Sequence, residues 1–448
     1  MFMLRLKHPR FGLETEFLIV DEAGQPTNSA DILLEACKNK RAGAYMHQEV
    51  SKCQIELGAS PKRTVRRTTK GFLTTLNEII EVAEDLDLRL LPLGAYPGKM
   101  VPKARKKEWY EMQAKMIGVK KWYGVLSRVC GFHFHYRLPK GTFDWNKWKL
   151  KRVLRSATAR ALVNQYNLLI AADPAIMTLT QSSPFYNGHY YCKDTRMALY
   201  RDVELEKPEI KGIHHDLSII ASLPRYEHTI TDMNHRIDTR KQFWLDALKK
   251  SHPSMYKLAK KANPLRFYWG AVRINRAGTF EHRGMDINLI SNLIGVSALL
   301  KGCLMAVESE RLKIVPSEIG IRQPFRMEEN KVYVPPFSYL KNHLQIDAIK
   351  QGMESSKIQD YCKRFYRFAI GFLDYPHDLA LGSIKTMIND GKTVSDEMIK
   401  YVKKRGEKLD EEIDQGLCAE LALRYAEELK HEIPKLLSHY IALDVGES

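Results

Sequence analysis

The chain has 448 residues, of which 44 % are hydrophobic and 10 % aromatic, so it can bury a large core and general disorder is excluded. Its formal net charge of +17 is typical either of a field that attracts anions or of a solvated basic surface. The basic residues are dispersed, and their densest clusters, at 62–70 and 103–107, are not interleaved with aromatic residues, which argues against nucleic acid as a partner.

The seven cysteines are scattered along the chain, and none is spaced as Cys-x-x-Cys. This argues against a disulfide or metal-binding framework and indicates reduced thiols in a cytoplasm. No run of about 18 apolar residues occurs, so we expect no membrane-spanning helix. The segment Met1 to Lys7 lacks the long apolar region of a secretion signal, and we therefore expect a cytoplasmic protein.

Alternation of apolar and polar residues predicts short strands in the first part of the chain. They are expected at 11–20, about 53–57, 88–93, within 124–138, at about 267–275 and at 279–285. The last two are joined by Arg276-Ala277-Gly278, a short loop typical of a β-hairpin.

Helical spacing of apolar residues predicts a helix over roughly 67–87 and a long one over 146–171. The long helix is expected to stop at Asp173-Pro174, because proline disfavours a helical conformation in the residue before it. From 287 onward the pattern is mostly helical, with a loop-rich stretch around 314–345. Helices are expected near 357–373, 394–405 and 417–439.

These elements predict an α+β protein with an antiparallel β-sheet that comes mainly from residues 1–290 and packs against helices. We expect residues 1–310 to form a sheet domain that carries the site. Residues 311–448 would form a mainly helical region packed on it, or the two parts would form one continuous domain.

Ligating side chains are concentrated on one face of the predicted strands. Side chains alternate across a strand, so residues two apart share a face and the apolar residues between them take the other. The polar faces hold Glu14 and Glu16, then Gln54 and Glu56, then His133, His135 and Arg137, and in the hairpin Arg273, Asn275, Glu281 and Arg283.

This set of side chains fits a cation and a phosphate together. Carboxylates on adjacent strands repel one another unless a cation lies between them, and Mg²⁺ prefers oxygen ligands. Arginine supplies the planar fork that grips a phosphoryl group. Each motif alone is also typical of an ordinary charged strand face. Together, on separate strands, they predict a metal–phosphate site on one face of the sheet.

Glycine-rich phosphate-binding loops are missing from the chain. Gly391-Lys392-Thr393 lacks the glycine of a P-loop, because Thr386 stands in its place, and no G-x-G-x-x-G occurs. If ATP binds to this chain, it binds on the sheet with metal ions and not on a P-loop.

Five linked motifs between about 12 and 290 resemble those of a known family. They are Gly12-Leu13-Glu14-Thr15-Glu16-Phe17, Gln54-Ile55-Glu56-Leu57 with Ser60-Pro61, Gly131-Phe132-His133-Phe134-His135, Thr180 to Gly188, and Gly278-Thr279-Phe280-Glu281-His282-Arg283 with Asp286. The chain resembles the carboxylate-amine ligases, the second family of glutamate–cysteine ligases, whose catalytic domain is glutamine synthetase-like.

The resemblance implies an ATP-dependent ligase in which Mg²⁺ or Mn²⁺ assists phosphorylation of a carboxylate and an amine then forms an amide. It implies that Glu14, Glu16, Glu56, Glu281 and His135 are metal ligands. It also implies that His133 and His135 approach the metal or the phosphates. Arg273 and Arg283 would stabilise the transferring phosphoryl group, and Glu49 would be a further ligand, although its place in the alternation differs.

The resemblance places the substrate near the loop that follows the long helix, with Ser182, Ser183 and Asn187 shaping it. Arg196 would contact a substrate carboxylate. The aromatic segments Trp109-Tyr110 and Phe267-Tyr268-Trp269 would either flank an adenine ring or belong to the core.

Two further functions remain open from the residues: a guanidino-kinase-like ATP phosphotransferase, and a non-catalytic protein that binds an anion or nucleic acid. The chain departs from the family at His282, where many members carry a small or aliphatic residue, and in its charge. We expect small-molecule substrates, an acid such as glutamate and an amine, and a monomer or homo-oligomer. The amine and the number of metal ions stay open.

Overall fold

A seven-stranded antiparallel sheet forms the centre of the computed structural model, which describes residues 9–152, 154–201, 203, 212–214, 217–373 and 378–445. Its strands follow the order β10-β11-β5-β1-β3-β2, and β4 pairs with the far end of β1. The strands are β1 (Phe11–Asp21), β2 (Met46–Gln48), β3 (Gln54–Gly58), β4 (Leu88–Leu91), β5 (Gly131–Arg137), β10 (Val272–Asn275) and β11 (Thr279–Asp286).

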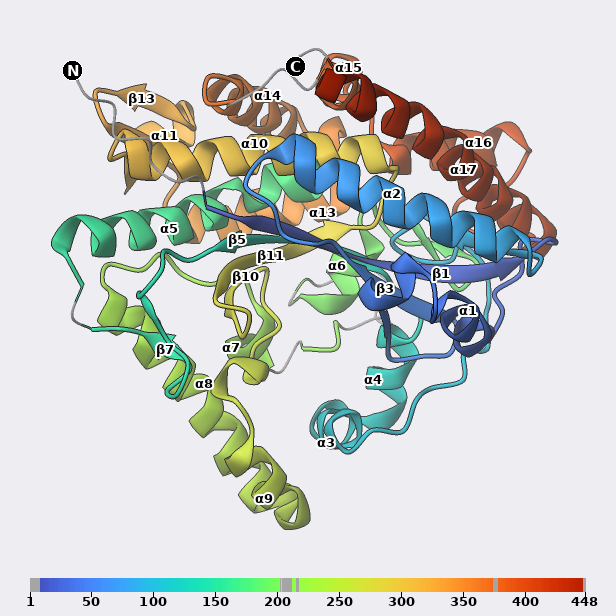
Figure 1. The fold of residues 1–448 in the computed structure, drawn as a ribbon, viewed down its shortest axis with the longest axis horizontal. Coiled ribbons are helices and arrows are strands. Elements are labelled where there is room, and N and C mark those ends of the chain that lie inside the picture. The colour runs from blue at the N-terminus through green and yellow to red at the C-terminus, as the bar shows by residue number, and fades with distance from the viewer. Residues whose placement is uncertain are drawn as a thin grey trace.

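Helices cover the back of this sheet, above it in Figure 1. The apolar residues of the alternating strands, among them Leu13, Phe17, Phe132 and Phe134, are buried in the core on this side. The helices of the covering layer are α2 (Val65–Glu84), α5 (Ser156–Leu179), α10 (Ile290–Ser309), α13 (Gln345–Gln351), α14 (Ser356–Ile370), α15 (Asp378–Asp390), α16 (Val394–Lys404) and α17 (Gln415–Val445).

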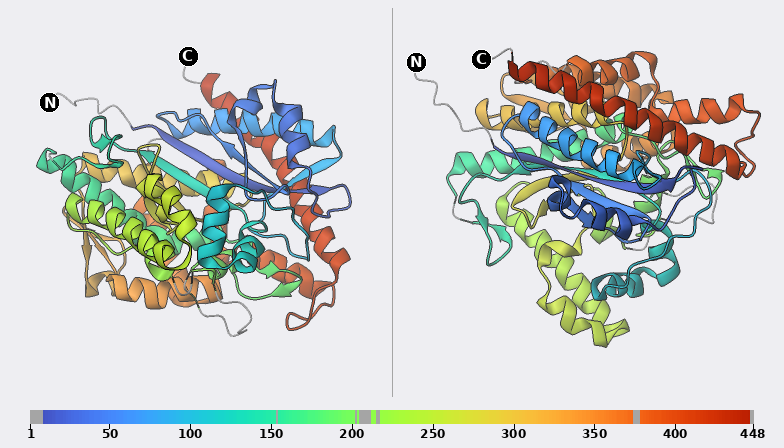
Figure 2. Two further views of the ribbon diagram at one scale, coloured as in Figure 1. Left: turned by 90° about the horizontal axis from the view of Figure 1, so that it is seen from below. Right: turned by 45° about the vertical axis from the view of Figure 1, so that its right-hand side comes forward.

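Two pairs of helices extend from the opposite, front side, below the sheet in Figure 1 and toward the viewer in the left view of Figure 2. They are α3 (Glu108–Ile117) with α4 (Val119–Leu126), and α8 (Ile230–Ser251) with α9 (Pro253–Lys261). Smaller apolar clusters hold these pairs in place, one of which joins Met112 of α3 to Trp244 and Leu248 of α8.

Short elements complete the fold. The helices are α1 (Ala30–Cys37), α6 (Thr195–Tyr200), α7 (Ser218–Ala221), α11 (Glu318–Arg322) and α12 (Phe337–Tyr339), with short helical turns at Arg41–Tyr45, Pro264–Phe267, Leu340–Leu344 and Gly352–Glu354. The strands are β6 (Phe143–Asp144), β7 (Lys149–Leu150), β8 (Phe185–Tyr186), β9 (His189–Tyr190), β12 (Lys313–Pro316), β13 (Arg326–Glu328) and β14 (Lys331–Val334).

The expected fold class is confirmed, with an antiparallel sheet from the first 290 residues and a helical C-terminal region. One buried core cluster contains residues from both regions, from Phe11 to Tyr440. The division at residue 310 stays a prediction. By length and composition α10 could cross a membrane, but 89 % of its most apolar window is buried inside the fold.

The bounds predicted for the long helix, 146–171, were wrong at both ends. Residues 149–150 form β7, and α5 begins at Ser156 and continues through Pro174 to Leu179. Proline removes one helical hydrogen bond, but this part of α5 is wholly buried, and the Tyr361 hydroxyl donates to the nearby Ala171 carbonyl at 2.6 Å. Packing on all sides therefore outweighs the local preference.

The segment 314–345 is also more ordered than its sequence suggested. It contains β13 and β14, which with β12 form a second, three-stranded sheet in the order β12-β14-β13. Each of these strands has only three or four residues, which is too short for alternation to stand out.

Candidate active site

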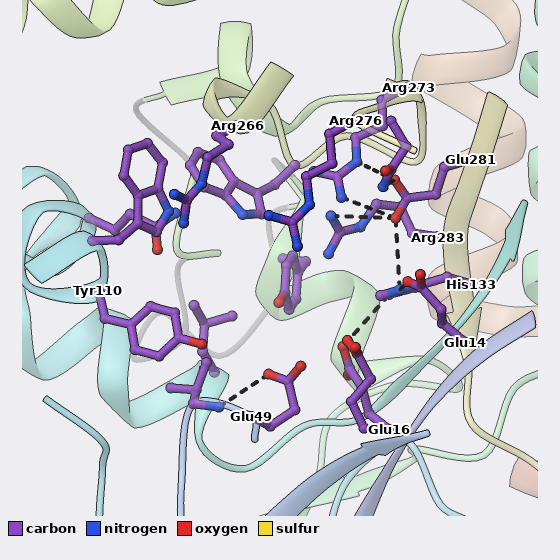
Figure 3. A pocket seen from close by; sticks show the side chains of 18 of the residues that line it. Glu14, Glu16, Glu49, Tyr110, His133, Arg266, Arg273, Arg276, Glu281 and Arg283 are labelled. Atoms are coloured by element: carbon purple, nitrogen blue, oxygen red, sulfur yellow. Dashed lines mark hydrogen bonds and ion pairs between the residues drawn. The ribbon is translucent and has the colours of Figure 1, made fainter. Parts of the chain in front are cut away.

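Metal-ligating side chains form a row across the front face of the sheet. The register pairs Glu56 with Glu16, Glu14 with His133, and His135 with Glu281 across neighbouring strands. Because alternation sends all of these side chains to the same face, β3, β1, β5 and β11 each contribute to one continuous site. Figure 3 shows Glu14, Glu16, His133 and Glu281 along one side of a cavity.

Glu14, His135 and Glu281 form the first candidate metal site, with one ligand atom of each within 4.8 Å of the others. The Nε2 atom of His135 lies 3.1 Å from Glu14 Oε2 and 4.0 Å from Glu281 Oε1. His133 lies beside them, with Nδ1 3.5 Å from the same Glu14 oxygen.

The two histidines have nitrogen atoms free for a ligand. Both Nε2 atoms are buried and have no partner in hydrogen-bond geometry among the described residues. His135 Nδ1 lies 3.0 Å from the Thr279 hydroxyl, and this contact fixes the ring with Nε2 toward the carboxylates. A buried, unpartnered nitrogen beside two carboxylates fits a bound cation.

Glu16, Glu49 and Glu56 form the second candidate metal site, again with ligand atoms within 4.8 Å of one another. Burial, with the neighbouring charges of Glu16 and Glu56, raises the pKa of Glu49 well above its ordinary value. Burial and the carboxylates of Glu14 and Glu16 raise the pKa of Glu56 to about 7. A cation shared by several carboxylates removes the repulsion that disfavours their ionised forms. This group of carboxylates therefore also fits Mg²⁺.

Glu281 is wholly buried, yet positive groups surround it. Arg273 forms a two-pronged pair with it through Nε and Nη2, and the Asn275 amide donates to Oε2 at 2.6 Å. Arg283 Nη1 lies 3.8 Å from Oε1. Burial alone would raise the pKa of Glu281, but Arg273 and Arg283 outweigh it and hold that pKa well below its usual range.

Two cavities meet at this row of side chains. The smaller one, about 430 Å³, lies in front of both candidate metal sites, and Arg266, Arg276, Trp109 and Tyr110 also line it. In Figure 3 the guanidinium groups of Arg266, Arg276 and Arg283 point into it from one side, opposite Glu16 and Glu49. Tyr110 comes from α3 and Arg276 from the hairpin turn.

The larger cavity, about 810 Å³, lies beyond Glu14 and His135. Its walls include Arg10, Arg137, Phe143 and Trp145. Glu14 lines both cavities, so a ligand in either one can reach the first candidate metal site.

The predicted substrate loop lies behind the row and lines neither of these two cavities. The Ser182 hydroxyl donates to the Ile287 carbonyl at 2.6 Å, and that of Ser183 accepts from the Arg196 backbone at 3.2 Å. Asn187 accepts from Arg128 at 2.7 Å. A direct role for these side chains in binding substrate stays a prediction.

Arg196 is buried in the same place. Its Nη1 donates to the Met285 carbonyl at 3.0 Å and lies 3.7 Å from Asp286 Oδ1. Its guanidinium covers Gly131, where a Cβ atom would approach Nη2 to 1.9 Å. The Gly131 N–H donates to Glu16 at 2.7 Å, so Arg196 supports a predicted ligand from behind. Its contact with a substrate carboxylate also stays a prediction.

Several cavity residues were missed from the sequence. Arg266 and Arg276 lie in turns and Tyr200 ends α6, so no alternating pattern marks them. The aromatic segments divide between the two roles left open for them. Trp109, Tyr110 and Trp269 line the smaller cavity, whereas Phe267 and Tyr268 line neither cavity and are buried.

Comparison with known proteins gives the family. A sequence model of glutamate-cysteine ligase family 2 matches residues 10–420, and the chain belongs to this family. A relative from Paracoccus denitrificans, provisionally named glutamate–cysteine ligase 2, is 26 % identical over 244 residues, 53 % of this chain and 58 % of the relative. One from Clavibacter sepedonicus with the same provisional name is 23 % identical over 227 residues, 50 % of this chain and 53 % of the relative. The chain thus spans little more than half the length of these relatives.

Two solved structures share the fold. A glutamate–cysteine ligase from Francisella tularensis, solved in complex with AMP, has a TM-score of 0.56 and 13 % identity, covering 100 % of this chain and 95 % of its own. A bifunctional glutathione synthetase from Pasteurella multocida has a TM-score of 0.58 and 14 % identity, covering 94 % of this chain and 53 % of its own. At these identities the likeness concerns the fold alone.

Proposed function

We propose that this protein is an ATP-dependent carboxylate–amine ligase of the γ-glutamyl type, acting in the cytoplasm. The observation that carries this proposal is the row of two carboxylate-rich sites along the smaller cavity, with Arg273 and Arg283 beside it and the larger cavity reaching the first site. Membership of glutamate-cysteine ligase family 2 supports this proposal.

Magnesium or manganese fits the residues that are present. Glu14, His135 and Glu281 would hold one ion, and Glu16, Glu49 and Glu56 a second. Bound there, the ions would neutralise charge on phosphate and carboxylate oxygens. The protein contributes the spacing of the ligands, which adjacent strands fix, and the two unpartnered histidine nitrogens described above.

ATP would enter through the larger cavity. Trp145, on the turn between β6 and β7, is 46 % exposed at its wall and offers a flat apolar surface for an adenine ring. Arg137 lies over the same indole, 5.7 Å from the ring centre. A triphosphate that extends from there toward Glu14 and His135 would bring its terminal phosphate to Arg273 and Arg283.

The acid would bind in the smaller cavity with its reacting carboxylate near Glu16 and Glu56. One of its oxygens attacks the γ-phosphorus of ATP, the bond from this phosphorus to the bridging oxygen of ADP breaks, and an acyl phosphate forms. The amine nitrogen then attacks the acyl carbon, the carbon–oxygen bond to phosphate breaks, and the amine loses a proton to water. The products are an amide, ADP and phosphate.

Arg273 and Arg283 would stabilise negative charge on the transferring phosphoryl group. Both are held by the ionised Glu281, so their positions are set before ATP binds, and such preorganised charge lowers the barrier to group transfer. His133 and His135 would orient the phosphates or the ion from the neighbouring strand.

The test is ADP release from ATP and Mg²⁺, measured for amino-acid carboxylates such as glutamate against a panel of amines that includes cysteine. We expect ADP release that needs both an acid and an amine, with the amide detected by mass spectrometry. A stable phosphorylated product would instead indicate a phosphotransferase. Binding without turnover, weakening steeply with salt, would indicate a non-catalytic anion-binding protein.

A further inference from the structure

Two guanidinium groups at the smaller cavity have no acidic partner in the part of the chain that the structure describes. Arg266 lies in the turn Pro264–Phe267 and Arg276 in the turn between β10 and β11, and both line the cavity. The other two cavity arginines, Arg273 and Arg283, are paired with Glu281. Among the described residues, no carboxylate lies within ion-pair distance of Arg266 or Arg276.

The Arg266 side chain and the turn that carries Arg276 are held by their surroundings. The Arg266 guanidinium carbon lies 3.9 Å from the centre of the Trp109 ring, a close cation–π contact. In the hairpin turn, Asn275 accepts from the Ala277 N–H at 2.8 Å while its amide donates to Glu281. The turn that carries Arg276 is therefore fixed relative to the first candidate metal site.

Positive charge is crowded on this side of the cavity. Partial burial lowers the pKa of Arg266, and the like charges of Arg276 and Arg273 lower it further. An anion between these groups would relieve the repulsion, and arginine forks bind carboxylates through paired hydrogen bonds.

The position of this arginine pair favours the amine as its ligand over ATP and over the reacting carboxylate of the acid. Neither arginine lines the larger cavity, where ATP is proposed to bind. Both are exposed at the cavity wall, whereas the second candidate metal site, where the reacting carboxylate of the acid is proposed to bind, is more buried. The amine reacts only after the acyl phosphate has formed, so it must reach this intermediate from the open side of the smaller cavity.

We propose that Arg266 and Arg276 bind a carboxylate of the amine substrate, so that the enzyme selects amines that carry a carboxylate over those that lack one. This inference rests on the proposed function. It assigns to these two residues the choice of amine, and it predicts that the preferred amines are amino acids.

The experiment compares cysteine with cysteamine, which differ only in the carboxylate, using the full chain with saturating ATP, Mg²⁺ and glutamate. A charge-assisted contact is worth about 1.5–3 kcal/mol, so the wild-type kcat/KM for cysteine should exceed that for cysteamine about 10- to 100-fold. Arg276→Gln and Arg266→Gln should each reduce this ratio at least about 5-fold by raising KM for cysteine. Arg322→Gln, an exposed arginine of α11 remote from both cavities, is the matched control and should retain the ratio.

The KM values for glutamate and ATP show whether the two arginines instead bind a carboxylate of the acid or a phosphate of ATP. They should stay within about twofold of wild type in both variants, and melting temperatures check the fold. A variant that raises KM for glutamate or for ATP while keeping the cysteine-to-cysteamine ratio would overturn the inference. So would equal use of the two amines by the wild type. No amine-dependent ADP release by the wild type would contradict the proposed function itself.

Discussion

Glu281 is the residue on which the proposed site depends most, because it contacts Arg273, Arg283 and Asn275 and belongs to the first candidate metal site. Glu281→Gln keeps the size of the side chain but removes its charge. We expect kcat for ADP release to fall at least about 100-fold, with the fold retained by circular dichroism. Glu310→Gln, the same substitution at an exposed glutamate that directly follows α10, is the control, and near-normal activity of Glu281→Gln would refute the assignment.

His214 gives the protein a pH dependence that does not involve the predicted metal ligands. It is buried, stacks on Trp269 with an interplanar angle of 13°, and lies 2.9 Å from the Tyr200 carbonyl through Nδ1. Burial lowers its pKa to about 4. Since the unfolded chain binds this proton near the ordinary value of about 6.5, the contribution of neutral His214 to stability is full above that pH.

Stability should therefore be lost as the pH falls from about 6.5 to 4, by up to about 3 kcal/mol from this residue. His214→Gln keeps a donor for the Tyr200 carbonyl but cannot take up the proton. Urea unfolding at pH 7 and pH 5 should show a smaller difference for this variant than for the wild type. An unchanged difference would show that His214 is not the group responsible.

At the scale of residues, alternation along the strands predicted which side chains share the front face. Glu14, Glu56, His133 and Glu281 all lie there, as their register shows. Arg266 and Arg276 could not be predicted, because a residue in a turn carries no periodic signal and its direction depends on contacts distant in sequence, such as that with Trp109.

A buried charged network joins α5 to the back of β11. Asp173 accepts from Arg201 at 2.7 and 2.8 Å and contacts His282 Nε2 at 2.9 Å. His282 lies between Glu281 and Arg283 but points to the opposite face. The network thus fixes the strand that carries two proposed site residues, and Gly284 is needed there, because a Cβ atom would lie 2.6 Å from Arg201.

Asp173→Asn should destabilise the protein by about 3–5 kcal/mol, because it leaves the buried Arg201 charge uncompensated. Asp360→Asn is the control, since it breaks an exposed pair with Arg364 within α14 and should cost less than about 1 kcal/mol. Urea unfolding measures both. Equal losses in the two variants would mean that the network adds nothing to stability.

At the scale of elements, β1, β3, β4, β5 and the hairpin were predicted because their signals are local. β2 has only three residues and was missed, and β10 begins at Val272, later than expected. The end of α5 was not predicted, because its passage through Pro174 depends on packing and on Tyr361, which is distant in the sequence. The same holds for β12 and β14, whose pairing joins segments that are too short to show a pattern.

For the whole molecule, the carboxylates of the two candidate metal sites couple cation binding to stability. An ion that binds only the folded chain stabilises it by about 2.7 kcal/mol at a hundredfold excess over its Kd. We expect Mg²⁺ to raise the melting temperature of chelator-treated protein. Glu49→Gln should reduce this increase, because Glu49 belongs to the second site. An equal increase in both proteins would place the ion elsewhere.

Four arginines and five glutamates line the smaller cavity, so the net charge of +17 does not arise there, and composition alone could not show this. The class of fold and the face that carries the ligands could be predicted from the sequence. The smaller cavity emerges only from the packing of α3, α4 and the turn at Pro264–Phe267 over the sheet.

The acyl phosphate proposed as the intermediate is tested most directly by following a carboxylate oxygen of glutamate into the released phosphate. Glutamate labelled with ¹⁸O in its γ-carboxylate is turned over with ATP, Mg²⁺ and the best amine, and the released phosphate is analysed by mass spectrometry. The proposed acyl phosphate predicts one ¹⁸O atom in each phosphate, in step with ADP and amide. Phosphate that contains no ¹⁸O while amide is formed would contradict it.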